Sequence, residues 1–183
     1  KFQFRGFQDP GVYHDEEYRK FGSNTRHSYY RLAKALYDQG RKDEAKEILD
    51  TALENIPDYS IPYSYFTSYY VELYYQLGER EKAEELADIL RTRALEVMDY
   101  VEQENKAGQF YSDLLRNSSI FINQLAFIYR RMAENAERQL RNTENQVNLN
   151  METVPEAELE RLREERDYYN AKYQEYIQLL GAG

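Results

Sequence analysis

The feature that most constrains this chain is a pair of related segments at a fixed spacing. The segment GRKDEA at residues 40–45 returns in altered form as GEREKA at residues 78–83, 38 residues further along a chain of 183 residues. A helical pattern of aromatic and aliphatic residues precedes each segment, and another such pattern follows it. A period of this length is typical of stacked helical hairpins, in which each unit buries its apolar face against its neighbours.

The residues around the first segment predict one helical hairpin. Gly40 favours the left-handed backbone that ends a helix, and Pro57 cannot continue one. Small alanines let the two helices approach closely. The apolar positions are Tyr29, Leu32, Ala33 and Leu36 in the first helix and Ala45, Leu49 and Ala52 in the second.

This pattern resembles the tetratricopeptide repeat, whose consensus has a small residue, two alanines and a proline at fixed positions. Those positions hold Ala33, Ala45, Ala52 and Pro57, and Tyr29 replaces the usual Trp. The usual period is about 34 residues. The longer spacing here is explained by an insertion at residues 58–61.

The second unit is a degenerate copy of the first. It keeps Ala83 but has Ala87 and Leu90 where a large and a small residue are expected. Ser60 is predicted to cap its first helix, because a serine side chain accepts hydrogen bonds from the first turn, and Pro62 is tolerated inside that turn.

The remainder of the chain must complete the apolar core, because about three repeats are needed for independent stability. Apolar residues recur at intervals of three and four positions over residues 109–141, which predicts an amphipathic helix. A polar loop is expected over residues 143–154. Thr153 and Glu156 form a capping-box pair that predicts a last helix, with Pro155 in its first turn. No apolar and polar alternation predicts a strand. The expected fold is all-α, with two tetratricopeptide-like hairpins capped by a longer helical hairpin, six main helices in total.

The expected organisation has three parts. Residues 1–22 form an N-terminal arm or linker, residues 23–105 hold the two hairpins, and residues 106–183 form a long hairpin that completes the same domain. The aromatic start at Phe2 and Phe4, without an initiator Met, suggests a fragment of a longer protein.

The composition of the chain argues against several classes of function. The chain has no Cys and two His, so thiolate zinc sites and cysteine nucleophiles are excluded. With 24 basic and 33 acidic residues its net charge is −9, which argues against a nucleic-acid backbone as partner. His14 and His27 lack the spacing of a metal motif. No apolar run is long enough to span a bilayer. We therefore expect a non-catalytic segment that needs no cofactor or metal.

The most unusual count is 19 tyrosines. The tetratricopeptide resemblance implies that ligands are read on the concave face of each first helix, while Tyr29, Tyr70, Tyr74, Tyr169 and Tyr173 serve packing. Tyrosine gives a recognition surface large, rigid contact area with a polar tip. The alternatives are that the concave tyrosines also serve packing, or that residues 1–22 fill the groove. The candidate groove residues are His27, Tyr30, Lys34, Tyr37, Tyr65, Ser68, Glu72 and Tyr75.

A second resemblance rests on the order and spacing of five short motifs within residues 1–105. They are DPGVY at 9–13, RLAKAL at 31–36, GRKDEA at 40–45, IP at 56–57 and PYSYF at 62–66. Together they resemble the C-terminal soluble region of the DUF2723 family, membrane proteins similar to protein O-mannosyltransferases. The resemblance implies a parent membrane glycosyltransferase with a lipid-linked sugar donor, whose catalytic carboxylates lie outside this chain. It also implies a tail on the extracytoplasmic, periplasmic face of a bacterial membrane.

Three functions follow from these observations. The first is a non-catalytic interaction domain that binds an acceptor protein or packs against the membrane domain of its own full-length chain. The second is a stand-alone adaptor that captures a peptide or protein in a Tyr-lined groove. The third is a carbohydrate-binding module, since such modules also use aromatic platforms.

Overall fold

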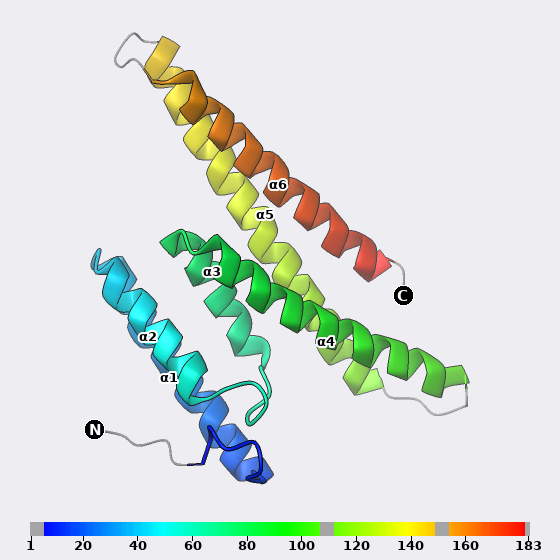
Figure 1. The fold of residues 1–183 in the computed structure, drawn as a ribbon. Coiled ribbons are helices and arrows are strands. Elements are labelled where there is room, and N and C mark those ends of the chain that lie inside the picture. Colours follow the sequence, from blue (N-terminus) through cyan, green and yellow to red (C-terminus); the bar gives the residue numbers. More distant parts are fainter. Residues whose placement is uncertain (1–5, 107–111, 149–153, 182–183) are drawn as a thin grey trace. The chain divides into compact units, whose positions relative to one another are not determined.

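The computed structural model describes residues 6–106, 112–148 and 154–181, and Figure 1 shows that most of these residues are helical. No strand occurs within them, so the all-α class is confirmed. The chain divides into two compact units, unit 1 at residues 1–92 and unit 2 at residues 93–183. The elements are α1 (Glu16–Asp38), α2 (Lys42–Asn55), the 3₁₀ helix η1 (Tyr65–Thr67), α3 (Ser68–Leu77), α4 (Arg80–Lys106), α5 (Ser112–Asn148) and α6 (Glu156–Gly181).

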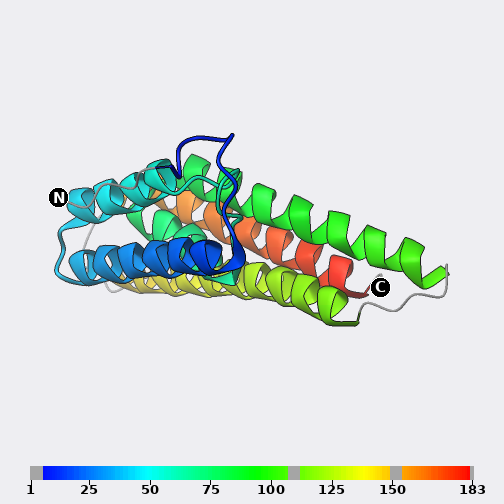
Figure 2. The same ribbon diagram turned by 90° about the horizontal axis from the view of Figure 1, so that it is seen from below.

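The predicted first hairpin is present as α1 and α2, which lie side by side in Figures 1 and 2. Gly40 has the expected left-handed backbone, with φ at +79°. Ala33, Ala45 and Ala52 are fully buried where the helices meet. Leu32 is 49% exposed and does not share this packed face, contrary to the prediction. The small alanines allow the close approach of the two helices, and Leu36 and Leu49 are buried in the same hairpin.

The first helix begins within the region expected to be an arm. Asp15 caps it by accepting a hydrogen bond from the Tyr18 backbone N–H at 2.8 Å, and Glu16 and Glu17 occupy the first turn. Acidic residues at this end are stabilised by the helix dipole. Residues 16–22 are therefore helical. Phe2 and Phe4 lie outside the described residues.

Ser60 does not cap a helix, and that prediction was wrong. Its buried hydroxyl donates instead to the backbone carbonyl of Phe7. The helical segment begins later, at η1, where the Ser64 backbone N–H donates to Thr67 Oγ1 at 3.2 Å in a capping box. Pro62 therefore lies before the helix. The hydroxyl of Ser60 anchors the N-terminal segment to the connection between α2 and η1, a role that local pattern does not reveal.

Arg26 ties this connection to α1 through three backbone carbonyls. Its Nη2 atom donates to the carbonyls of Ile56 at 2.8 Å and Ile61 at 2.7 Å, and its Nη1 atom lies 3.5 Å from the carbonyl of Pro62. The guanidinium carbon lies 4.8 Å from the centre of the Tyr63 ring. The side chain is almost fully buried, so these bonds supply donors to carbonyls that water does not reach.

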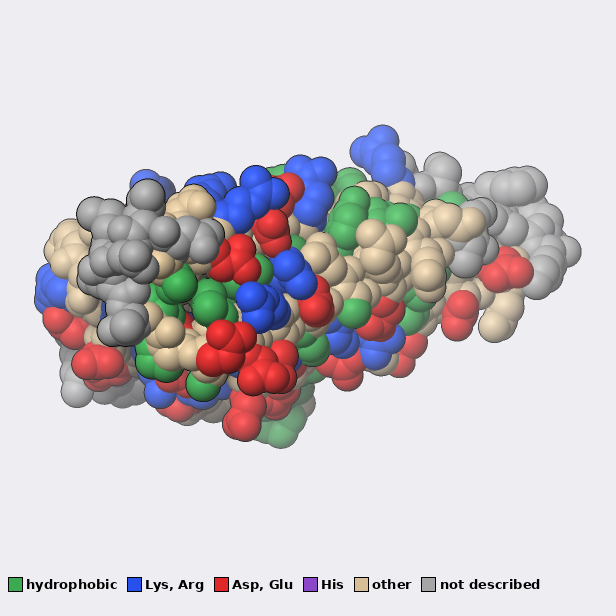
Figure 3. All heavy atoms as spheres, turned by 90° about the horizontal axis from the view of Figure 1, so that it is seen from above, with side chains coloured by type: hydrophobic (Ala, Val, Ile, Leu, Met, Phe, Trp, Pro, Cys, Tyr) green, Lys and Arg blue, Asp and Glu red, His purple; other side chains and the backbone are tan. Residues whose placement is uncertain are grey.

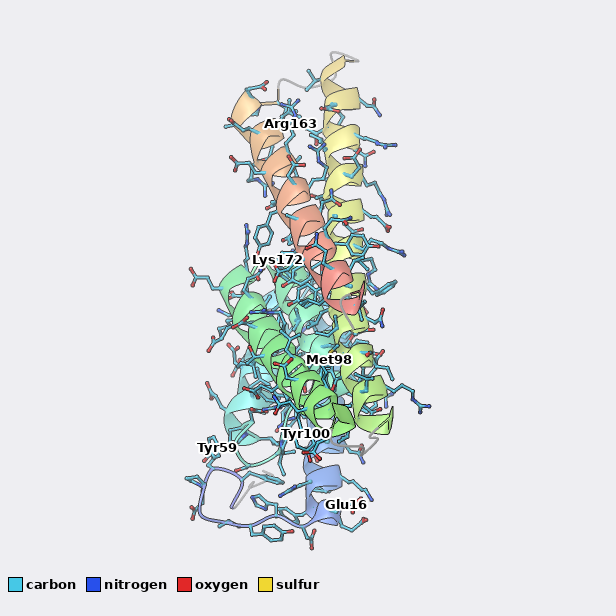
Figure 4. The ribbon with its side chains drawn as sticks, turned by 90° about the vertical axis from the view of Figure 1, so that its right-hand side faces the viewer. Glu16, Tyr59, Met98, Tyr100, Arg163 and Lys172 are labelled. Atoms are coloured by element: carbon cyan, nitrogen blue, oxygen red, sulfur yellow. The ribbon has the colours of Figure 1, made fainter. Side chains whose placement is uncertain are left out.

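A small apolar cluster packs beside Arg26. Phe7, Ile56 and Ile61 are each buried and contact one another. A Cβ atom added at Gly22 would lie 2.9 Å from Ile61 Cγ1, so the absence of a side chain there permits the contact. Tyr59 and Glu16 lie at the same end of unit 1 in Figure 4, where the Tyr59 hydroxyl donates to the Gln8 carbonyl at 3.0 Å.

The second hairpin consists of α3 and the start of α4, joined at Gly78, whose φ is +82°. It is linked to α2 by polar side chains. Asp50 accepts hydrogen bonds from the Tyr74 hydroxyl at 2.8 Å and from Lys82 Nζ at 2.6 Å. Lys46 also pairs with Glu79 at 3.0 Å. The two hairpins of unit 1 are therefore joined across α2.

The predicted long hairpin is present in unit 2 as α5 and α6, which lie side by side. Along its apolar seam the rings of Tyr129 and Tyr176 stack, with centroids 5.2 Å apart. Leu140, Leu159 and Leu162 form a second buried cluster. The hairpin is therefore held by apolar side chains along much of its length.

The loop predicted over residues 143–154 is shorter than expected, because α5 continues to Asn148. Glu144 pairs with Arg163 of α6 at 3.2 Å, so contacts between the helices favour the additional turn. Arg163 lies near the end of the hairpin where the two helices are joined (Figure 4). Pro155 precedes the last helix instead of lying in its first turn, and Thr153 lies outside the described residues.

Candidate protein-interaction surface

Five aromatic side chains meet on the first helices of the two hairpins. The ring of His27 lies 4.5 Å from that of Phe66, Tyr30 lies 5.4 Å from Tyr69, and Tyr65 lies 5.6 Å from Tyr69. They come from α1, η1 and α3, which pack together in unit 1. We call the five residues the aromatic cluster: His27, Tyr30, Tyr65, Phe66 and Tyr69.

The aromatic cluster is accessible without being loosely held. Phe66 is 40% exposed and the other four side chains are half-buried. The Tyr69 hydroxyl donates to the Tyr65 hydroxyl oxygen at 3.3 Å, which raises the pKa of Tyr69 to about 12, and burial adds to the rise. Tyr69 is therefore neutral at physiological pH. The cluster therefore presents aromatic rings to a ligand, and Tyr69 adds no negative charge to it.

Two predicted groove residues lie further along α1. Lys34 and Tyr37 are half-buried, and the Lys34 ammonium lies 5.4 Å from the centre of the Tyr37 ring. Lys34 also pairs with Asp38. Its charge is therefore shared between a carboxylate and a ring, and these residues add a polar end to the face that carries His27 and Tyr30.

The other three predicted groove residues are buried. Ser68 donates to the Tyr65 carbonyl at 2.7 Å, Glu72 accepts from the Gln76 side chain at 3.0 Å, and Tyr75 donates to Glu84. Their exposed fractions are 0%, 7% and 6%. The structure thus places Tyr65 in the aromatic cluster and gives Ser68, Glu72 and Tyr75 internal partners. Their role in binding stays a prediction.

Sequence reasoning missed Phe66 and Tyr69. The repeat register placed Tyr65 within the first helix of the second unit, but Tyr65 begins the 3₁₀ helix η1. Residues three apart eclipse one another in such a helix, which changes the directions of the side chains. The available signal was the aromatic run from Tyr63 to Phe66 followed by Tyr69 and Tyr70.

Several tyrosines serve packing as predicted. Tyr70, Tyr74 and Tyr169 are buried, whereas Tyr29 and Tyr173 are half-buried. The Tyr70 hydroxyl donates to the Arg26 carbonyl at 2.5 Å. Burial raises the pKa of Tyr70 and of Tyr74 well above that of an ordinary tyrosine, and the hydrogen bond to Asp50 raises the pKa of Tyr74 further.

Other chemistry has little support in the described ranges. His14 is buried between the rings of Phe7 and Tyr18, at 5.2 Å and 5.1 Å, which is a packing environment. Within these ranges, no group of three or more acidic or histidine side chains is arranged to hold a metal ion.

None of the described helices combines the length and apolar character required to cross a bilayer. Figure 3 shows acidic side chains beside basic ones on the face in view.

Comparison with known families identifies one repeat. Residues 27–59 match the tetratricopeptide repeat, a segment that covers most of α1, the turn at Gly40 and all of α2. The matched range contains Ala33, Ala45, Ala52 and Pro57, the positions on which the resemblance rests. No curated protein and no solved structure matches the chain. The chain therefore has an all-α, tetratricopeptide-like fold, and the aromatic cluster includes residues from the matched repeat and from the helix that follows it.

Proposed function

We propose that unit 1 is a helical-repeat protein-interaction module that binds a polypeptide segment at the aromatic cluster. The observation that carries this proposal is the accessible contact between His27 and Phe66 on the first helices of successive hairpins. Tetratricopeptide-like folds are typically non-catalytic, and the match at residues 27–59 supports that class for this segment.

The chemistry of the cluster favours apolar side chains with nearby hydrogen-bonding groups. Aromatic rings supply large contact area and lose little conformational entropy on binding. Phe66 is the most exposed of the five, so an aliphatic or aromatic side chain of the partner would contact it first. The hydroxyl groups of Tyr65 and Tyr69, which lie 3.3 Å apart, place polar atoms beside these rings. We therefore favour a protein or peptide over a charged small molecule.

The proposed context is the extracytoplasmic, periplasmic tail of a membrane glycosyltransferase similar to protein O-mannosyltransferases. Support comes from the five motifs at residues 9–66 that resemble the DUF2723 family. The partner would then be an acceptor protein or the membrane domain of the same full-length chain. The reading frame upstream of Lys1 tests this context directly. A frame without transmembrane helices would refute it and leave the stand-alone adaptor.

Site-specific photo-crosslinking tests the proposed binding surface. A photoreactive p-benzoylphenylalanine at position 66 of the full-length protein, in its own cells, should crosslink a distinct polypeptide that mass spectrometry identifies. The same group at position 59, where Tyr59 is 61% exposed outside the cluster, is the matched control. Tyr30→Ala should weaken the crosslink at position 66.

Two outcomes would count against this function. Equal crosslinking from positions 66 and 59 would show that the cluster has no special role. Heat released on titration with one member of a glycan panel, without any crosslinked polypeptide, would favour the carbohydrate-binding alternative, since sugars also stack on aromatic rings.

A further inference from the structure

A separate pocket lies among α2, α3, the start of α4 and the connection that contains Tyr63. It has a volume of about 310 Å³ and shares no residue with the aromatic cluster. Tyr74 and Leu86 are buried and form its deep end, whereas Glu54, Glu85 and Ile89 are exposed at its rim. The pocket therefore has an apolar interior and an acidic entrance.

The carboxylates of this pocket differ in their partners. Asp50 is satisfied by the Tyr74 hydroxyl and by Lys82, the sole basic residue in the lining. The carboxylates of Glu54 on α2 and Glu85 on α4 have no ion-pair partner within the described residues. The lining thus contains three carboxylates and one ammonium group. The carboxylates of Glu54 and Glu85 are the two that pair with no basic side chain in the described part of the chain.

A second hollow extends the acidic surface along α2. It has a volume of about 520 Å³ and shares Asp50 and Glu54 with the pocket. Asp43 and Glu47 also line it, and its one basic residue, Lys46, pairs with Glu79. The pocket and this hollow share two lining residues, so a polypeptide of several residues can contact both.

We propose that this pocket is a second binding site, which takes an arginine side chain of a partner polypeptide with an aliphatic residue beside it. The planar guanidinium can donate to Glu54 and Glu85 together, as arginine does in paired contacts with carboxylates. Its methylene stem would lie on Leu53 and the flanking aliphatic residue on Ile89, both of which line the pocket. The acidic middle of the chain, with sixteen acidic and seven basic residues at 42–106, favours a basic partner.

An NMR titration tests the site without a known partner. The probe is a blocked heptapeptide, Gly-Ser-Leu-Arg-Leu-Ser-Gly, added to the full chain labelled with ¹⁵N. Amide shifts should concentrate in α2 and in residues 80–89 of α4. The same peptide with citrulline in place of arginine keeps the shape and removes the charge, and it should bind about tenfold more weakly, as expected for the loss of charge-assisted hydrogen bonds.

Matched variants distinguish the pocket from general charge attraction. Glu54→Gln with Glu85→Gln should weaken binding of the arginine peptide about tenfold. Glu81→Gln with Glu96→Gln changes the net charge equally at exposed positions outside the pocket and should leave binding nearly unchanged. Lys82→Met should strengthen binding several-fold, because it frees Asp50 from its competing cation; a damaged fold would weaken it.

The proposal is overturned if the arginine peptide does not bind, if citrulline binds equally well, or if both double variants weaken binding alike. Shifts confined to the aromatic cluster would overturn it as well. Phe66→Ala should not change binding of this peptide. Failure of this site and failure of the aromatic cluster are therefore separate results.

Discussion

The two units of this chain are both built from helices, but their helices are fixed in different ways. Unit 1 uses buried and half-buried polar groups that join distant segments: Arg26 donates to the carbonyls of the α2–η1 connection, and Asp50 accepts from Tyr74 and Lys82. In unit 2, α5 and α6 pack through apolar and aromatic side chains, with ion pairs beside them. Buried polar bonds have defined directions, so unit 1 can hold an irregular connection, whereas an apolar seam requires only helical periodicity.

The sharpest way to break unit 1 is to remove Arg26. Arg26→Met keeps an unbranched apolar stem but leaves the carbonyls of Ile56 and Ile61 buried without their donors, and each such loss costs about 1 to 3 kcal/mol. We expect a fall of about 3 to 5 kcal/mol in the free energy of unfolding of unit 1. Hydrogen exchange should show lost protection in α1 and α2. A fall below about 1 kcal/mol would show that the connection is held by its apolar contacts alone.

Unit 2 should instead be sensitive to cavities. Leu125 is fully buried on α5, and Leu125→Ala should cost about 2 to 4 kcal/mol through lost burial and the cavity left behind. Hydrogen exchange should show the loss in α5 and α6. Phe127→Ala is the matched control, because Phe127 is 43% exposed and its truncation should cost little. An equal loss of protection in α1 and α2 would contradict the comparison.

A smaller effect should follow from filling the space at Gly22. The new methyl group of Gly22→Ala would lie 2.9 Å from Ile61 Cγ1, and overpacking costs about 1 to 3 kcal/mol. The gain in helix propensity offsets about 1 kcal/mol. We expect a net loss of about 1 kcal/mol, measured by urea unfolding, and no loss for Ser28→Ala at an exposed position of the same helix. A stabilised Gly22→Ala variant would show that Ile61 moves freely.

The smallest effect concerns the charges of unit 2. Hydrogen bonding from Arg141 lowers the pKa of Glu137, and Arg166 of α6 lowers it further. A carboxyl group whose pKa is lower in the folded state stabilises that state above its unfolded pKa, about 4.3. The contribution is lost as the pH falls through the folded pKa. Glu137→Gln should make the free energy of unfolding of α5 and α6 slightly less dependent on pH below about 4.3. An unchanged pH dependence would contradict the pairing of Glu137 with Arg141 and Arg166.

The predictable part of the fold is the part encoded by local signals. Gly40 and Gly78 end helices by their own backbone preference, and the alanines at 33, 45 and 52 mark the close approach between α1 and α2. The role of Ser60 could not be predicted from local sequence, because its hydroxyl donates to the carbonyl of Phe7, more than fifty residues earlier in the chain. The added length of α5 likewise depends on α6, through the pair of Glu144 with Arg163.

The candidate site was predicted less completely than the fold. The repeat register found His27, Tyr30 and Tyr65, which the structure brings into one cluster, but it also selected Ser68, Glu72 and Tyr75, which are buried. The register assumes that every first helix begins with the same geometry. In the second unit a 3₁₀ turn comes first, so neighbouring positions project in directions that a consensus does not describe.

The bonds from Arg26 also bear on how this repeat could be reused in protein engineering. The connection at residues 56–62 depends on α1, since the carbonyls of Ile56 and Ile61 accept hydrogen bonds from Arg26 and the packing of Ile61 requires the bare backbone of Gly22. A designer who transplanted that loop into a regular repeat array would also have to transplant Arg26 and Gly22 of α1. The transferable unit is therefore the loop together with two residues that lie thirty or more positions upstream.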